Sequence, residues 1–267
     1  MANNFKNVIK LVNQVKEQLP VEQAFLQDLK RSIELDDMKN ERKPSQSYKP
    51  SSMNCIRNMF YQVIGAEQDG GMSSYTSIGI CNSGSDIHER IQYAVLQMQE
   101  NGIDCEYVNV ADYVRSRKLD YLEIKKKPDF RKGIFETKLY HKKLNMSFLC
   151  DGIIRYKGKY YILELKTETV NKWYNREGVD QLHYNQGTAY SIAFDIPDVI
   201  FVYINRDMLD MKAFMFTPTS EMKNDLVGKI EECDGYVKRL VAPPKPKDVA
   251  KKTCDYCNYK SRCRKDG

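Results

Sequence analysis

The sequence predicts a mixed α/β protein built on a central sheet that is flanked by helices. Residues 133–168 are rich in alternating apolar and polar side chains, which is typical of strands. Segments with helical spacing of apolar residues precede and follow this stretch, at 85–100 and 178–194. With 267 residues, of which 42% are hydrophobic, the chain can bury one sizeable core.

The first part of the chain is predicted to be a helical appendage. Residues 3–36 carry apolar side chains at helical spacing, and Pro20 is well placed to open a second helix. The polar stretch "LDDMKNERKPSQSYKPSS" that follows is typical of a linker. We therefore expect residues 1–45 to be appendage and linker, and residues 46–267 to form the main domain. The apolar positions of the first helix are Phe5, Val8, Ile9, Val12 and Val15.

Further helices and strands follow from local patterns. A helix is expected from Cys55 to about Ile64, before a Gly-rich turn. In the helix 85–100, Asp86 and Glu89 fit a capping box. Its apolar stripe consists of Ile87, Ile91, Val95 and Met98. The remaining expected elements are a helix at 178–194, strands at 198–205 and 211–216, and a helix at 219–240.

Two acidic residues and a lysine interrupt the apolar strands of the middle region. Lys157-Gly158 predicts a hairpin turn, and that register places Asp151 opposite Glu164. Because side chains at i and i+2 of a strand share a face, Lys166 joins Glu164 there. Two neighbouring carboxylates repel each other, and Mg²⁺ or Mn²⁺ would relieve that repulsion and could act on a phosphate. A salt bridge on a solvated sheet face is the alternative interpretation.

A single histidine, His88, borders the apolar stripe of the helix 85–100 near its first turn. Taken alone, such a histidine is typical of a surface or hydrogen-bonded side chain rather than of a ligand.

The cysteines indicate a metal site near the carboxyl end. Cys254, Cys257 and Cys263 form C-x2-C-x5-C in a basic tail, residues 248–267, that has too few apolar residues to fold alone. Three thiolates need a fourth ligand from elsewhere in the chain. Spacing alone leaves the role of Cys55 open, and it does not distinguish zinc from iron–sulfur. The other cysteines, at 81, 105, 150 and 233, are in contexts typical of ordinary buried positions.

Charge and hydropathy indicate which partners and which cellular location to expect for this protein. The net charge is +6, and residues 238–266 contain ten Lys or Arg against three Asp. This basic tail favours a phosphate backbone as partner, with a solvated charged face as the alternative. No run approaches the roughly 20 apolar residues of a membrane span, and the polar start "MANNFKNVIK" is unlike a secretory signal. We expect a cytoplasmic protein that does not interact with membranes.

Five motifs together resemble the PD-(D/E)XK nuclease superfamily, in its RecB-like branch. Asp151…Glu164-Leu165-Lys166 resembles the D…(D/E)-x-K signature, and "GSDIHERIQ" resembles the upstream histidine motif. "HYNQGTAY" resembles the Q-x3-Y motif. "SSMNCIRNMFY" with the terminal C-x2-C-x5-C resembles the split four-cysteine [4Fe-4S] site of AddB-type and CRISPR-adaptation-type nucleases. The motifs cover about residues 50–265 in the order of that family, although Cys150 stands where a proline is usual.

The resemblance implies a restriction-endonuclease-like core and a role for each matched residue. His88, Asp151, Glu164 and the carbonyl of Leu165 would bind Mg²⁺ or Mn²⁺, with Lys166 as the catalytic lysine. Gln186 and Tyr190 would hold DNA or the lysine, and Arg57 would have a structural or DNA-contact role. The [4Fe-4S] cluster would be bound by Cys55, Cys254, Cys257 and Cys263.

The implied function is a metal-dependent deoxyribonuclease, an exonuclease acting on single-stranded ends of DNA. Alternatives are an endonuclease that trims DNA ends for recombination or spacer processing, and a non-cutting DNA-binding module of the same fold. A zinc-ribbon interaction protein would explain the tail but not the carboxylates. No G-x4-G-K-[ST] motif occurs in the chain, so we expect any helicase or recombination motor to be a separate partner protein.

Overall fold

The computed structural model describes residues 19–39, 45–69, 73–132, 134–247 and 249–266. The described residues divide into two compact units. Residues 19–39 and 73–82 belong to the smaller unit, and the others belong to the larger one. The predicted helix with Phe5 to Val15 lies outside the described residues.

The smaller unit contains helix α2, Val21–Lys39, and the start of helix α4, Tyr75–Gln97. Helix α2 follows Pro20 directly, and the Pro20 carbonyl accepts the amides of Gln23 and Ala24, as the sequence predicted. The Lys30 ammonium lies 4.7 Å from the centre of the Tyr75 ring.

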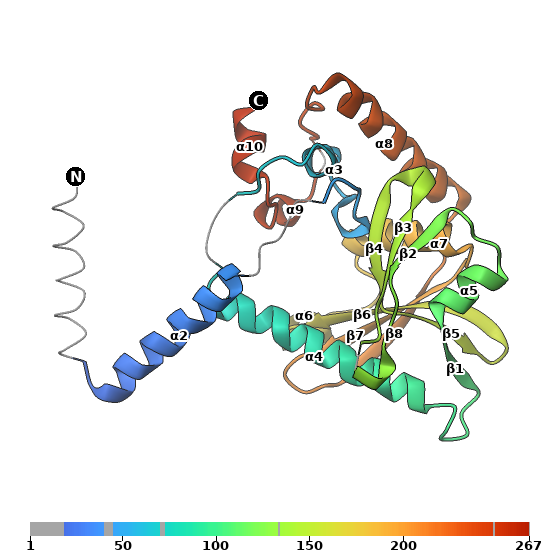
Figure 1. The fold of residues 1–267 in the computed structure, drawn as a ribbon, viewed down its shortest axis with the longest axis horizontal. Helices are drawn as coiled ribbons and strands as arrows, with labels where there is room; N and C mark the ends of the chain where they lie inside the picture. The colour runs from blue at the N-terminus through green and yellow to red at the C-terminus, as the bar shows by residue number, and fades with distance from the viewer. Residues whose placement is uncertain (1–18, 40–44, 70–72, 133, 248, 267) are drawn as a thin grey trace. The chain divides into compact units, whose positions relative to one another are not determined.

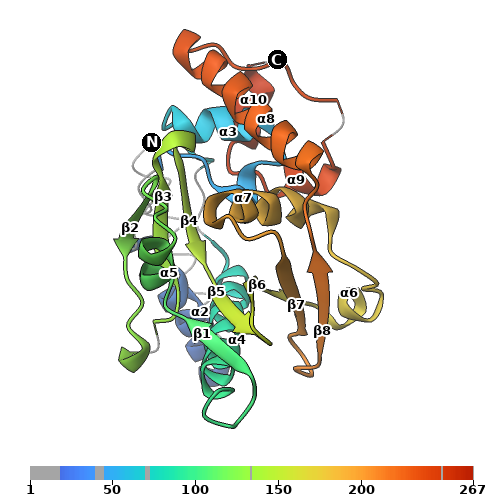
Figure 2. The same ribbon diagram turned by 90° about the vertical axis from the view of Figure 1, so that its right-hand side faces the viewer.

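The larger unit is built on a mixed five-stranded sheet, in the order β1-β5-β6-β7-β8 (Figure 2). Strands β6 and β7 are parallel, and the other neighbouring pairs are antiparallel. A second, three-stranded antiparallel sheet has the order β2-β3-β4. The strands are β1 Cys105–Val108, β2 Leu122–Lys126, β3 Thr137–His141, β4 Met146–Cys150, β5 Gly152–Tyr156, β6 Lys159–Glu168, β7 Val199–Asn205 and β8 Met211–Phe216.

Helices cover both faces of the five-stranded sheet. One face carries Ile153, Ile162 and Phe201, which pack in a large core that also holds buried residues of α3, α7 and α8. On the opposite face, Leu163 and Leu165 pack with Ile87 of α4. Figures 1 and 2 show α7 crossing the sheet, with α3 and α8 beyond it. These helices are α3 Ile56–Val63, α7 Tyr184–Phe194 and α8 Ser220–Arg239.

This arrangement confirms the predicted fold class, a mixed α/β fold with a central mixed sheet flanked by helices. The β5–β6 hairpin has the predicted register, because Tyr156 pairs with Lys159 and Gly152 pairs with Leu163. Lys157 and Gly158 both have positive φ, at 48° and 80°. That conformation is typical of a tight two-residue hairpin turn.

Helix α2 continues to Lys39, so the first residues of the predicted linker are helical. Two helix starts also differ from the expectation. Helix α4 begins at Tyr75 rather than near residue 85, so Asp86 lies inside the helix and the predicted capping box with Glu89 is wrong. Small and polar residues such as Gly79 and Gly84 hide this first part of the helix in the sequence. The helix expected at 178–194 begins only at Tyr184, after the short 3-10 turn Gln181–His183.

Short elements complete the larger unit. They are α5 Val110–Ser116, α6 Val170–Tyr174, α9 Lys251–Asp255 and α10 Lys260–Lys265. The 3-10 turns are Pro50–Ser52, Phe130–Lys132, Lys142–Leu144 and Gln181–His183. Among the described residues, no helix is long and apolar enough to cross a membrane.

Candidate active site

Strand β6 presents Glu164 and Lys166 on the face that α7 covers. The Lys166 ammonium donates to Glu164 Oε1 over 2.7 Å and to Gln186 Oε1 over 3.0 Å. Gln186 in turn donates through Nε2 to the same Glu164 oxygen, over 2.6 Å. Only 4% of the Glu164 side chain and 22% of the Lys166 side chain are exposed. The pair is therefore buried and held in a fixed geometry, unlike a salt bridge on a solvated face.

Asp151 lies where β4 ends and β5 begins, and three groups donate hydrogen bonds to it. Its carboxylate Oδ2 accepts the amide of Leu165 over 2.7 Å. Its backbone carbonyl accepts Gln92 Nε2 over 2.7 Å and the Tyr107 hydroxyl. Gly152 leaves room for that tyrosine, since a Cβ there would lie 2.9 Å from the Tyr107 ring. The carboxylate is thus fixed in position beside β6.

A group of possible metal ligands forms around Asp151. Ligand atoms of His88, Glu136 and Asp151 all lie within 4.8 Å of one another. His88 comes from α4, and its Nδ1 lies 3.6 Å from Asp151 Oδ1. Glu136 precedes β3, so the three residues come from separate parts of the chain.

The pKa values of this region show the effect of burial and of crowded charge. Burial raises the pKa of Glu164, and the Lys166 ammonium offsets this only in part. Burial also raises the pKa of Glu136, and the Asp151 carboxylate adds to that rise. For His88, burial lowers the pKa, but the hydrogen bond and charge of Asp151 outweigh it, so the pKa is raised. Negative charge in this site is therefore under-compensated.

The donor set fits a divalent cation. Carboxylate oxygens suit Mg²⁺ and Mn²⁺, and an imidazole nitrogen is also acceptable to Mn²⁺. A cation here would relieve the repulsion between Asp151 and Glu136. In a strand, the N–H and C=O of one residue point to the same side. The Leu165 carbonyl therefore leaves β6 on the side where its amide meets Asp151.

The structure brings Gln186 and Tyr190 to the Glu164–Lys166 pair. They lie one turn apart on α7, and Gln186 Nε2 donates to the Tyr190 hydroxyl over 3.0 Å. Tyr190 is 3% exposed, and its hydroxyl donates to the Leu149 carbonyl over 2.9 Å. The resemblance implied that these residues hold either DNA or the lysine. This geometry favours holding the lysine, which Gln186 contacts directly and Tyr190 contacts through Gln186. Tyr190 lies too deep to reach a ligand in solution.

The four cysteines of the predicted cluster come from the start of α3 and from the C-terminal tail, and among the described residues they do not form a group of ligand atoms within 4.8 Å of one another. Burial raises the pKa of Cys55, and the thiols of Cys254 and Cys263 add to this rise. The pKa of Cys257 is raised by burial and then by the other three thiols. Cys55 caps the start of α3, Cys254 lies in α9 and Cys263 lies in α10. The thiols thus influence one another across about 200 positions of sequence, and the four-cysteine site stays a prediction.

Arg57 ties α3 to the C-terminal tail. Its guanidinium donates to the carbonyls of Pro243, Cys263 and Asp266 over 2.7 to 2.9 Å. It also contacts Cys263 Sγ at 3.3 Å, and the residue is 3% exposed. The resemblance implied either a structural role or a DNA contact for Arg57. The geometry favours the structural role, because the guanidinium is enclosed by protein.

Glu136 is not among the site residues predicted from the sequence. It lies in the segment "GIFETK", and a single glutamate is common at the polar positions of an alternating strand. Glu164, which was predicted as a ligand, lies outside the group that Glu136 completes. Its Oε1 is engaged by Lys166 and Gln186.

Comparison with known proteins finds distant likenesses among solved structures. No protein-family model matches the chain, and no curated protein matches it in sequence. Among solved structures, a crystal structure of SSO0001 is 16% identical, with a TM-score of 0.45 over 92% of this chain and 98% of that one. A crystal structure of LHK-Exo in complex with dAMP is 10% identical, with a TM-score of 0.40 over 73% of this chain and 91% of that one. At these TM-scores, the function has to be argued from the residues of this chain.

Proposed function

We propose that the protein is a metal-dependent deoxyribonuclease that hydrolyses DNA phosphodiesters, as an exonuclease acting on single-stranded ends. The observation that carries this proposal is the group of His88, Glu136 and Asp151 beside the buried Glu164–Lys166 pair. A binding module has no need of a metal-ligand group next to a buried lysine. The motif resemblance supports DNA as the substrate, and the basic tail fits that charge.

His88, Glu136 and Asp151 would hold the cation, and Glu164 and the Leu165 carbonyl are further proposed ligands. Mg²⁺ or Mn²⁺ at this position would supply Lewis acidity at the scissile phosphate. The Lys166 ammonium is held by Glu164 and Gln186, so it is oriented before substrate arrives. It would stabilise the negative charge that develops on the phosphate oxygens in the transition state.

The protonation state of Lys166 is consistent with this role. Burial lowers the pKa of Lys166, but the carboxylates of Glu164 and Asp151 more than reverse that effect. The lysine therefore stays protonated at neutral pH and acts as a cation. Abstraction of a proton from water is accordingly not assigned to it.

We propose in addition that Cys55, Cys254, Cys257 and Cys263 bind a [4Fe-4S] cluster. The C-x2-C-x5-C spacing supports this proposal, as does Arg57, which follows Cys55 closely in sequence and donates to the Cys263 carbonyl and Sγ. The role of the cluster would be structural, because it would close a loop of about 200 residues. Iron and zinc analysis with visible absorption tests this. A colourless protein with stoichiometric zinc would overturn the iron–sulfur proposal and leave the nuclease proposal intact.

The test of the nuclease proposal is cleavage of end-labelled single- and double-stranded DNA with Mg²⁺, Mn²⁺ or EDTA. Anaerobically purified full-length protein is compared with Glu164→Ala and Lys166→Ala. Matched controls are Glu123→Ala and Lys125→Ala, since Glu123 and Lys125 form an E-x-K pair of the same spacing on the exposed part of β2. We expect metal-dependent cleavage that falls by about a thousandfold in the two site variants. The controls should retain it.

The products separate the alternatives. A ladder that shortens from one end supports the exonuclease, and internal fragments from circular single strands would indicate the end-trimming endonuclease. Binding without cleavage in every metal would favour the non-cutting module. Equal cleavage by Lys166→Ala and wild type would remove the proposed site.

A further inference from the structure

A polar cavity of about 440 Å³ opens beside the Lys166 side chain. Its walls come from the segment before α3, from the start of α7 and from the C-terminal tail. Lysines line it at three places, Lys49, Lys166 and Lys252, and amide side chains such as Asn54 and Asn58 lie between them. No carboxylate lines this cavity among the described residues. It is therefore suited to an anion with hydrogen-bonding groups.

His183 lines the same cavity, and its hydrogen-bond partners favour one tautomer. Its Nδ1 lies 2.9 Å from the Tyr203 hydroxyl, and the Asp180 amide donates to that hydroxyl oxygen over 3.0 Å. The phenol has a single proton, and donating it to Nδ1 satisfies both partners. Nδ1 is then the acceptor, and the ring proton is on Nε2. Within the described part of the chain, Nε2 has no protein hydrogen-bond partner, so its N–H is available to the cavity.

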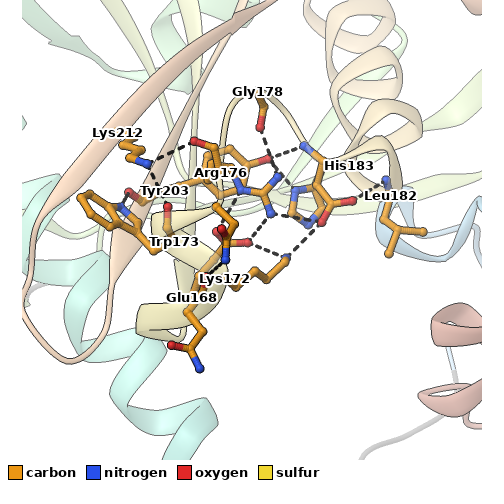
Figure 3. Close-up of polar contacts among 12 residues, drawn as sticks. Glu168, Lys172, Trp173, Arg176, Gly178, Leu182, His183, Tyr203 and Lys212 are labelled. Carbon is orange, nitrogen blue, oxygen red and sulfur yellow. Dashed lines mark hydrogen bonds and ion pairs between the residues drawn. The ribbon is translucent and has the colours of Figure 1, made fainter.

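A network of charged side chains holds this histidine in place. Figure 3 shows Arg176 between Glu168 and the loop that carries Gly178 and His183. The Asp180 carboxylate caps the turn before α7 by accepting the Leu182 amide over 3.1 Å. The imidazole stacks on the Phe201 ring, with centres 6.0 Å apart and an angle of 13° between the planes. The ring is thus fixed in both position and orientation.

The imidazole is neutral at the pH of the cell. Burial lowers the pKa of His183, the Lys166 ammonium adds to this and Asp180 opposes it, and together these effects bring the pKa to about 3. Lys172 and Arg176 also face the ring and disfavour its charged form. A neutral Nε2–H donates a directional hydrogen bond without adding another charge next to Lys166.

We propose that this cavity is the subsite for the nucleotide adjacent to the scissile phosphodiester, with the His183 Nε2–H donating to a phosphate oxygen of that nucleotide. This subsite rests on the proposed nuclease function, and it identifies the part of the substrate that the cavity binds. The cavity's lysines neutralise the phosphates, and its amides match the donors and acceptors of a base edge. Tyr256, which is 82% exposed at the cavity wall, offers a ring on which an unpaired base can stack.

The experiment measures affinity without cleavage. Binding of a fluorescent single-stranded 12-mer to the full chain is followed by anisotropy in EDTA, for wild type, His183→Asn and His183→Gln. The asparagine amide reaches about the position of Nδ1, so it can keep the Tyr203 contact and loses the donor at Nε2. The glutamine amide reaches about the position of Nε2 and keeps that donor. We expect a roughly tenfold weaker Kd for His183→Asn, and a Kd within about threefold of wild type for His183→Gln.

The salt dependence adds a second readout that a merely structural role would not reproduce. Because the proposed donor is neutral, the slope of log Kd against log salt should be the same in His183→Asn and in wild type. It should fall by about 0.7 in Lys252→Ala, which removes one phosphate contact to a single strand. Thermal melting of each variant checks that it is folded.

Two results would overturn the subsite. One is a His183→Asn protein that is folded and binds as tightly as wild type, and the other is an equal loss of affinity in His183→Asn and His183→Gln. A smaller salt slope in His183→Asn would overturn the neutral donor. Failure of the nuclease proposal is a separate result, namely wild type that binds the 12-mer but does not cut DNA with Mg²⁺ or Mn²⁺.

Discussion

Two Glu-x-Lys pairs in this chain have the same spacing and the same ion-pair contact, although β2 has a register shift between Ile124 and Lys126, and their surroundings differ. Glu123 and Lys125 on β2, like Glu164 and Lys166 on β6, are two residues apart on a strand. In each pair the ammonium donates to the glutamate Oε1 over 2.7 Å. The side chains of the β2 pair are each 46% exposed, whereas those of the β6 pair are 4% and 22% exposed.

This difference shows that the chemical behaviour of a Glu-x-Lys pair depends on its surroundings. An exposed pair of this kind contributes about 0–1 kcal/mol and is screened by salt. The β6 pair is covered by Gln186 and faces the Asp151 carboxylate. Because the β6 pair is buried, its charges interact strongly with neighbouring charged groups. Such an environment favours binding of a cation or of a substrate phosphate.

The largest expected effect is on catalysis, from Asp151→Asn. The asparagine carbonyl can still accept the Leu165 amide, but the site loses one anionic ligand. We expect cleavage with Mn²⁺ to fall by about a thousandfold. In EDTA the melting temperature should stay equal or rise, because a repelling carboxylate is gone. Cleavage assays and calorimetry measure both, with Glu123→Gln as the control. A variant that keeps a tenth of the wild-type rate would contradict the assignment.

The next effect is on stability, and it compares the two lysines directly. Lys166→Met leaves Glu164 buried without its cation, so the free energy of unfolding should fall by about 3 kcal/mol. Lys125→Met breaks an exposed pair and should change it by less than about 1 kcal/mol. Urea denaturation in EDTA measures the difference. Equal effects of the two substitutions would mean that burial does not separate the pairs.

A smaller effect is expected on metal affinity, from Glu136→Gln. Its carboxylate lies within the ligand group of His88 and Asp151, so its loss should weaken Mn²⁺ binding at least about tenfold. Titration calorimetry without DNA measures this independently of cleavage. Glu123→Gln should bind Mn²⁺ as wild type does, and unchanged affinity in Glu136→Gln would exclude that residue as a ligand.

The smallest effect is a pH dependence at Glu168, the second glutamate of β6. Glu168 is paired with Arg176 and Lys172, and these partners outweigh burial and lower its pKa below the ordinary 4.5. Its ion pairs therefore stabilise the fold fully above pH 4.5, and this contribution is lost as the pH falls through the lower folded-state pKa. The stability gap between wild type and Glu168→Gln should narrow in that acidic range. A gap that widened there would mean that the pKa is raised.

Much of the fold follows from local sequence. The Lys157-Gly158 turn adopts the positive φ values that a tight hairpin needs, and this alone places Asp151 opposite Glu164. The limits of β8 and α8 agree with their apolar patterns to within about one residue. The early start of α4 was missed, because a stretch rich in small residues carries no apolar stripe.

The sequence by itself determined the sheet-centred α/β class, the hairpin register and the residues of the β6 pair, because each depends on spacing along one stretch of chain. Only the tertiary structure decided that Glu136 joins His88 and Asp151, that Arg57 is enclosed by the tail, and that His183 opens into the cavity beside Lys166. These contacts join elements far apart in sequence. They are set by how the layers pack, and no local pattern encodes that packing.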